Sequence, residues 1–74
     1  MSEFGVLLFH TTSSALRAEK VLQRAGLTVK LIPTPREFSS DCGMALRFPW
    51  TQVEHVQAVL AAARVDLADI RRME

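Results

Sequence analysis

Residues 4–14, FGVLLFHTTSS, decide the fold of this chain because they join a buried strand to the start of a helix. The run from Phe4 to His10 is apolar on both faces until its last residue, a pattern typical of a central strand in a sheet. The hydroxyl residues 11–14 are candidate helix N-caps, since their side-chain oxygens can accept hydrogen bonds from amides of a first turn. The stretch therefore predicts a strand followed at once by a helix.

The predicted helix runs to about Ala25, and Gly26 suits the position just after a helix end. Apolar residues at helical spacing form one stripe of it: Ala15, Ala18, Leu22 and Ala25. Basic residues form another face, which we interpret as solvated, with a docking surface as the alternative: Arg17, Lys20 and Arg24. The helix is therefore amphipathic and should cover a sheet with its apolar stripe.

Two further strands are predicted at residues 29–32 and 44–48, and a proline follows each of them. Between them lies a loop, residues 34–43, that is long for so small a protein, and long ordered loops are more often functional than short connections. A last and weaker strand is predicted at residues 68–72, where Ile70 is the main apolar anchor in a charged segment.

The second helix is predicted to begin at Thr51, because Thr51 and Glu54 match a capping box in which each side chain accepts from the other residue's amide. Apolar residues at helical spacing would form its buried stripe: Val53, Val56, Leu60 and Ala63. We expect Trp50, just before this cap, to pack over the edge of the core. His55 is expected on the surface.

The elements follow in the order strand, helix, strand, strand, helix, strand (βαββαβ). The simplest packing places two helices on one face of a four-stranded antiparallel sheet, an α+β ferredoxin-like sandwich, and right-handed crossovers favour the strand order 4-1-3-2. Residues 1–74 then form a single small ferredoxin-like domain. The face without helices should carry Lys30 and Arg47, and several large apolar side chains there would bury that face in a dimer.

The composition indicates a small globular protein without a dominant charge. Of the 74 residues 49% are apolar, and the net charge of +1 gives no general attraction to nucleic acid or to a membrane surface. The apolar runs are shorter than the roughly 20 residues that span a bilayer. The first three residues lack the basic segment of a signal peptide. We therefore expect a cytoplasmic protein in which a free thiol stays reduced.

Cys42 is the only cysteine, and it lies in the polar run Ser39-Ser40-Asp41-Cys42-Gly43 rather than in an apolar segment. A lone loop thiol forms neither an internal disulfide nor a multi-cysteine metal site, but it can act as a nucleophile or hold a persulfide, a soft ion or a mixed disulfide. We interpret Cys42 as reactive, with an inert cysteine before the strand as the alternative. We expect no resident metal or cofactor.

The predicted topology places polar residues at the same sheet edge as Cys42. His10 ends the first strand, which neighbours the third, and the helix start at Thr11, Thr12 and Ser13 follows it. A helix N-terminus favours anions, and so does a nearby imidazolium. Both would therefore favour the thiolate of Cys42. Alternatively, His10 is a satisfied polar strand end and the hydroxyl residues are simply helix caps.

The loop itself supplies further candidates. Arg36 would favour the thiolate if the loop folds back, whereas Asp41 opposes it, because a neighbouring carboxylate disfavours a second negative charge. Ser39, Ser40 and Asp41 are also ordinary turn formers, which is their simpler role. Gly43 would let backbone or a ligand approach closely.

Two stretches of the chain resemble the selenium/sulfur carrier-like proteins, a family of short bacterial and archaeal chains. The similarity spans about residues 4–62 and is carried by residues 9–12 with 15–20 and by residues 31–48. Its most specific part is the block Pro-Arg-Glu-x-Ser-Ser-Asp-Cys-Gly, at residues 35–43. Ser13 and Ser14 stand where that family frequently has histidines, so any help from those histidines is missing here.

The resemblance implies that Cys42 is a carrier residue and that the protein takes part in selenium or sulfur handling. Its partners would be a sulfur or selenium donor, such as a cysteine desulfurase, and an acceptor enzyme. Such a protein is more a carrier than a turnover enzyme. The alternative is a small non-enzymatic binding or regulatory module that dimerises through its sheet, since ferredoxin-like folds host many functions. A copper chaperone is disfavoured by the single thiol, and an RNA-binding sheet by the missing aromatic residues.

Overall fold

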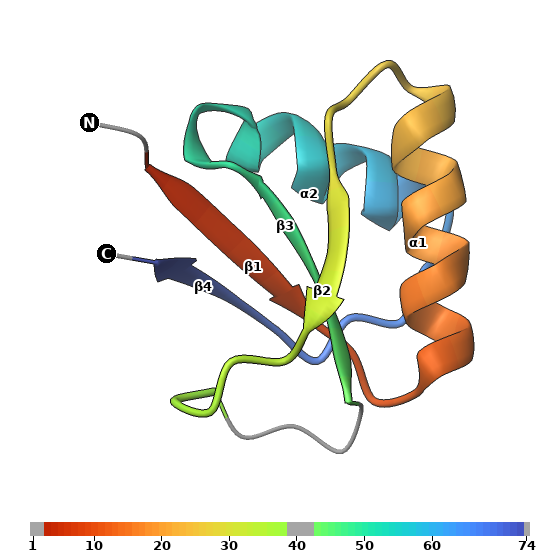
Figure 1. Cartoon of the computed structure of the whole chain (residues 1–74). Coiled ribbons are helices and arrows are strands. Elements are labelled where there is room, and N and C mark those ends of the chain that lie inside the picture. The colour runs from red at the N-terminus through yellow and green to blue at the C-terminus, as the bar shows by residue number, and fades with distance from the viewer. Residues whose placement is uncertain (1–2, 39–42, 74) are drawn as a thin grey trace.

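The structure is a computed structural model that describes residues 3–38 and 43–73. Its elements follow in the expected order, with one additional short 3₁₀ helix (Figure 1). They are β1 (Phe4–Leu8), α1 (Thr12–Arg24), β2 (Lys30–Pro33), β3 (Met44–Pro49), the 3₁₀ helix η1 (Trp50–Gln52), α2 (Val53–Ala62) and β4 (Asp69–Met73).

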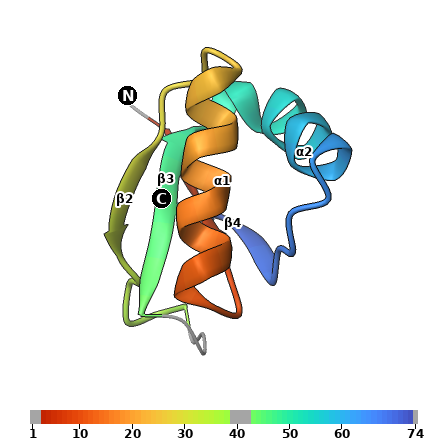
Figure 2. The same ribbon diagram turned by 90° about the vertical axis from the view of Figure 1, so that its right-hand side faces the viewer.

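The four strands form one antiparallel sheet in the order β2-β3-β1-β4, which reads β4-β1-β3-β2 from the other edge. β1 lies inside the sheet, where Leu7 pairs with Leu46 of β3 and with Ile70 of β4. Both helices cover the same face of the sheet (Figure 2). The expected α+β class, with a four-stranded antiparallel sheet and two helices, is therefore confirmed.

The burial of β1 explains why its sequence is apolar without alternation. Val6, Leu7 and Leu8 are all buried, so both faces of this strand lie inside the protein. The strand ends at Leu8 rather than at the predicted His10. Phe9 is still fully buried, whereas His10 is exposed, so the chain leaves the sheet between these two residues.

The main core lies between the sheet and the helices. α1 contributes Ala15, Ala18 and Leu22, all fully buried. Ala25, which was predicted to belong to the same stripe, is exposed instead. The reason is that α1 ends at Arg24, where the chain turns, and Gly26 follows with the positive φ of 82° that glycine adopts without a Cβ clash.

The predicted capping box of α2 is wrong. Thr51 lies inside η1, α2 begins at Val53, and its N-cap Gln52 makes no side-chain capping bond. The chain instead enters η1 directly after β3, where the Trp50 amide donates a hydrogen bond to the Glu3 carbonyl at 3.1 Å, and α2 begins only after this 3₁₀ turn. The helix still buries Val56 and Leu60 as predicted, while Val53 and Ala63 are half-buried.

A second apolar cluster lies on the sheet face that the helices leave open. It consists of buried Val6, Leu8 and Ala45, with half-buried Ile32, Phe38 and Met73 packed against them. Phe38 comes from the described start of the long β2–β3 loop, so this part of the loop packs over the sheet.

The strand register places Lys30 and Arg47 on this open face as predicted, because they pair with one another and alternate with core residues. The Arg47 guanidinium lies 4.6 Å from the centre of the Phe4 ring. Of the apolar residues on this face, Val6, Leu8 and Ala45 are therefore covered by the chain's own side chains.

Two other surface predictions are confirmed. Trp50 is half-buried and packs against the main core at its edge, with its ring 5.9 Å from that of Phe48. His55 is exposed on α2. The last strand begins at Asp69 and ends at Met73, one residue later than predicted, and Ile70 is its anchor in the core.

Candidate functional site

At one end of the sheet β1 and β2 end and β3 begins (Figure 1). We call this end of the sheet, which is formed by strand ends and not by an outer strand, the site edge. Leu8, the last residue of β1, pairs with Ala45 of β3, and Pro33 pairs with Met44. The start of α1 lies at this edge as well. The structure therefore brings together the end of β1, the start of α1 and both ends of the β2–β3 loop, as the sequence predicted.

Four of the predicted site residues lie outside the described residues: Ser39, Ser40, Asp41 and Cys42. Their positions along the chain are bounded by described neighbours. Gly43 is exposed and directly precedes β3, and its carbonyl accepts a hydrogen bond from the Thr34 amide at 3.0 Å. The base of the β2–β3 loop is thus fixed at the site edge by a backbone pair that continues the β2–β3 ladder.

Gly43 has no crowded surroundings that would require a glycine. A Cβ built on it meets nothing within 4 Å, and its φ lies outside the left-handed region. The expected close approach of backbone therefore finds no counterpart in the described residues around Gly43.

His10 and the helix start behave differently from one another. His10 is exposed between β1 and α1, so its imidazole is accessible at the site edge. Thr11 is the N-cap of α1: its Oγ1 accepts from the Ser14 amide at 3.1 Å and its carbonyl accepts from the Ala15 amide at 3.2 Å. The amides of Ser14 and Ala15 are therefore both satisfied by Thr11 and are not free to bind an anion.

The remaining predicted residues of this group are exposed. Thr12 and Ser13 lie in the first turn of α1, which contains no acidic residue. A helix N-terminus without carboxylates keeps its attraction for anions. Arg36 is exposed in the β2–β3 loop, within a turn in which the Phe38 amide donates to the Pro35 carbonyl at 3.0 Å.

The described part of this loop contacts the open face of the sheet. Phe38 packs against the second apolar cluster, and Glu37 and Phe38 line a shallow pocket of about 260 Å³ with Arg72 and Met73. Met73 pairs with Phe4 at the far end of β1, so this pocket lies away from the site edge. Sequence reasoning missed this anchor because it treated residues 34–43 only as a polar loop.

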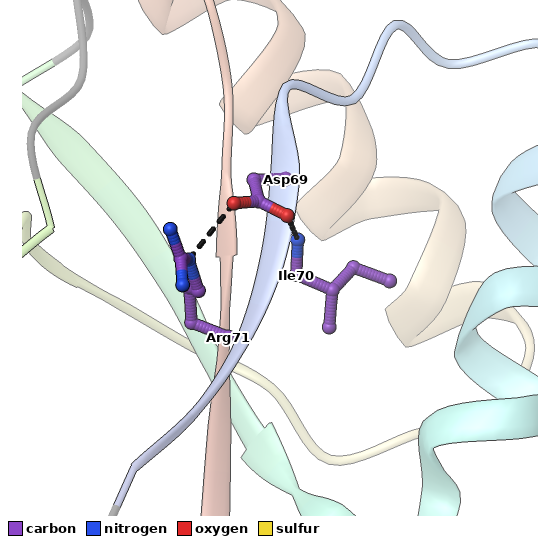
Figure 3. Close-up of polar contacts among 3 residues, drawn as sticks. All are labelled: Asp69, Ile70 and Arg71. Carbon is purple, nitrogen blue, oxygen red and sulfur yellow. Dashed lines mark hydrogen bonds and ion pairs between the residues drawn. The ribbon is translucent and has the colours of Figure 1, made fainter.

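Asp69 is a polar residue near the site edge that the sequence reasoning also missed. It pairs with Leu8 across β1 and β4. Its Oδ1 accepts from the Ile70 amide at 2.8 Å, and its Oδ2 lies 2.9 Å from Arg71 Nε (Figure 3). The spacing of two along a strand is the signal that could have predicted the pair, because such residues share a face. Both side chains are half-exposed, so the ion pair contributes little to stability.

Within residues 3–38 and 43–73, no three His, Cys, Asp or Glu side chains lie close enough together to hold a metal ion. In the same part of the chain, no helix has the length and apolar character needed to cross a bilayer.

The fold and the site edge define a small α+β domain with a long β2–β3 loop that contains a single cysteine. Residues 4–72 match the family described as "Putative Se/S carrier protein-like", and the chain belongs to this family. It is also 33% identical, over 60 residues, to the uncharacterized protein YtiA of Escherichia coli strain K12. That similarity covers 81% of this chain and 69% of YtiA. No solved structure matches the chain.

Proposed function

We propose that this protein is a carrier that holds sulfur or selenium on the thiol of Cys42. The observation that carries the proposal is the family match, which spans residues 4–72 and so includes the Ser-Ser-Asp-Cys-Gly run. The fold supports it as well, because Thr34 and Gly43, at the two ends of the loop that contains this run, are hydrogen-bonded to one another at the site edge. Cys42 would thus be held beside the surface.

The proposed step is the transfer of a sulfane sulfur between cysteines. The Cys42 thiolate attacks the outer sulfur of a persulfide on a donor protein. A new S–S bond forms on Cys42, the S–S bond of the donor breaks, and the donor cysteine leaves as a thiolate, so no net oxidation or reduction occurs. The proton of the persulfide stays on the transferred sulfur. Delivery to the acceptor is the same exchange in reverse, and a selenium atom in place of the outer sulfur follows the same balance.

In this proposal the start of α1 and His10 stabilise the negative charge of the persulfide on Cys42. The first turn of α1, with Thr11, Thr12 and Ser13, would favour the anionic persulfide, and an imidazolium at His10 would add to this. Thr11 contributes as the N-cap of α1, since its side-chain oxygen accepts a hydrogen bond from the Ser14 amide.

The loop residues complete the proposed site. Arg36 would attract the same negative charge, whereas Asp41 would oppose it. Ser39 and Ser40 would shape the turn before the thiol. Gly43 would leave space for the partner's cysteine, which agrees with the open surroundings of its Cα.

The proposed partners are a persulfide donor of the cysteine desulfurase class and an acceptor enzyme, with the carrier as a single cytoplasmic domain. We further assign the arrangement to the ferredoxin-like sandwiches, which the sheet order and the two helices on one face support.

The competing function, a binding or regulatory module that dimerises through its sheet, needs an exposed apolar face. Val6, Leu8 and Ala45 on the open face are buried within the chain, so no observation favours that module.

The test is intact mass spectrometry after incubation with a bacterial cysteine desulfurase and L-cysteine. We expect the protein to gain one sulfur atom, which a thiol reductant removes. Cys42→Ser is the matched control, because it keeps the size of the side chain and removes the thiol. A wild-type protein that gains no sulfur, or a Cys42→Ser protein that gains as much, would exclude the carrier function.

A further inference from the structure

The outer face of α1 is the solvent-facing side of that helix, opposite its buried stripe. Helical spacing of three and four residues places its members in one row. They are Ser13, Leu16, Arg17, Lys20 and Arg24, and all of them are exposed. This outer α1 face begins in the first turn of α1 and therefore at the site edge (Figure 1).

The charges on this face are of one sign. Arg17, Lys20 and Arg24 are basic, the face holds no carboxylate, and no ion pair involves these three among the described residues. By contrast, Arg71 and Arg72 are each paired with a carboxylate near the sheet. The chain as a whole carries only +1, so the positive charge of α1 is a local feature.

The face is also joined to the end of α2. Arg17 Nη2 donates a hydrogen bond to the Ala63 carbonyl at 2.9 Å. The next residue is Arg64, an exposed fourth cation whose φ of 55° ends the helix. Arg17 is therefore held in place before any partner arrives, which reduces the side-chain entropy that binding would cost.

An apolar contact point accompanies these cations. Leu16 is 43% exposed and is the only exposed large apolar residue that the described part of the chain contains. Arginine is enriched in protein–protein interfaces, and Leu16 adds an exposed apolar contact beside Arg17. The low net charge and the lack of aromatic residues on this face argue against a nucleic acid in its place.

We propose that the outer α1 face is the docking surface for an acidic patch on the protein that gives sulfur or selenium to Cys42. This inference rests on the carrier function proposed above. Complementary charges would steer the two proteins together and fix their orientation, while Leu16 supplies the apolar contact. A partner on this face would lie beside the site edge, because α1 begins there.

The chain supplies a matched pair of variants in its two lysines, Lys20 on α1 and Lys30 on β2, both exposed. Lys20→Glu and Lys30→Glu change the net charge equally but alter different faces. Lys20→Glu should leave α1 intact, because a glutamate four residues before Arg24 is a favourable helix pair. Circular dichroism and the unfolding midpoint would establish that both variants are folded.

The first experiment measures docking without sulfur chemistry. A short poly-L-glutamate peptide, as a model acidic surface, is titrated into the labelled protein, and amide shifts are followed by NMR. We expect shifts concentrated on residues 13–24 and 64, abolished by salt and weakened about fivefold by Lys20→Glu but not by Lys30→Glu. Shifts spread over the sheet, or equal weakening by both variants, would overturn the proposal.

The second experiment measures the rate of sulfur transfer from a cysteine desulfurase, with inorganic polysulfide as a donor that needs no docking. We expect Lys20→Glu to slow transfer from the enzyme about fivefold, to leave polysulfide loading unchanged, and to lower the salt dependence, whereas Lys30→Glu behaves as wild type. If neither donor loads Cys42, the carrier function fails while the peptide titration still tests the docking face. The docking proposal would be overturned if a DNA duplex bound at this face and the rate of sulfur transfer from the desulfurase were unchanged by Lys20→Glu.

Discussion

The Thr34 amide donates a hydrogen bond to the Gly43 carbonyl at 3.0 Å, which closes the base of the loop that contains Cys42. This pair follows directly on the Pro33–Met44 pair of the β2–β3 ladder, so the loop is an extension of a hairpin. Cys42 is therefore one residue away from a fixed backbone position, although it belongs to the longest connection in the fold.

Gly43→Ala separates a structural role of Gly43 from a role in access. We expect the free energy of unfolding to stay within about 0.5 kcal/mol of wild type or to rise by up to about 1 kcal/mol, because the position is open and the unfolded chain loses freedom. Urea unfolding measures this free energy, and the rate of persulfide loading measures how accessible the Cys42 thiol is. Slower loading at unchanged stability would assign Gly43 to partner approach, whereas a large loss of stability would contradict the open surroundings.

Cys42→Ala and Leu22→Ala form a second comparison. Leu22 is fully buried, so its truncation should cost about 2–5 kcal/mol. Cys42 lies outside the apolar stripes of the sequence, so its truncation should leave the unfolding midpoint nearly unchanged. Thermal unfolding of both variants decides this. A Cys42→Ala protein that fails to fold would mean that the main role of the residue is structural.

Thr11→Ala and Thr51→Ala test the two helix starts against one another. Thr11 caps α1 through the Ser14 amide, so its loss should cost about 0.5–2 kcal/mol. Thr51 is exposed within η1, and α2 has no side-chain cap, so Thr51→Ala should stay within about 0.5 kcal/mol of wild type. The measurement is the urea midpoint of each variant. Equal losses would restore the capping box at Thr51.

Gly5→Ala should destabilise the protein by overpacking β1. A Cβ at this position would lie 2.6 Å from Trp50 Cε3 and 2.7 Å from Phe48 Cζ, inside the van der Waals contact of both rings. Overpacking of this kind costs about 1–3 kcal/mol, because the stacked rings must move from their places over the strand. Chemical denaturation checks the value, and Gly43→Ala is the control for the same chemical change in an open place. A Gly5→Ala protein as stable as wild type would show that the two rings can shift freely.

Local patterns in the sequence predicted most of the elements, because each pattern had a single physical cause. The unbroken apolar run of β1 follows from its burial on both faces, and the hydroxyl run before α1 follows from the need to cap its amides. The start of α2 was missed because the chain first forms η1 from Trp50, whose amide bonds to the Glu3 carbonyl, so that α2 begins only at Val53. Local sequence carries no record of such a contact.

The candidate site was predictable in its topology and less so in its surroundings. Neighbouring strand ends follow from the order of elements, so the site edge could be foreseen. The position of Phe38 could not, because one aromatic residue in a polar loop does not indicate which face of the sheet it covers. The pairing of Asp69 with Arg71, by contrast, follows from their spacing of two residues once β4 is assigned as a strand.

Phe38, in the described part of the β2–β3 loop, packs against the open face of the sheet. Phe38→Ala therefore tests whether this contact anchors the loop to that face. Phe38 is half-buried against the second apolar cluster, so we expect a loss of about 1–3 kcal/mol, below the 3–5 kcal/mol of a fully buried phenylalanine. We also expect faster hydrogen exchange of the amides at residues 36–38, because the loop then opens locally without global unfolding. Glu37→Ala is the matched control, since Glu37 is exposed beside Phe38 and should change neither quantity. Exchange in Phe38→Ala as slow as in wild type would mean that the backbone turn at Pro35 holds the loop by itself.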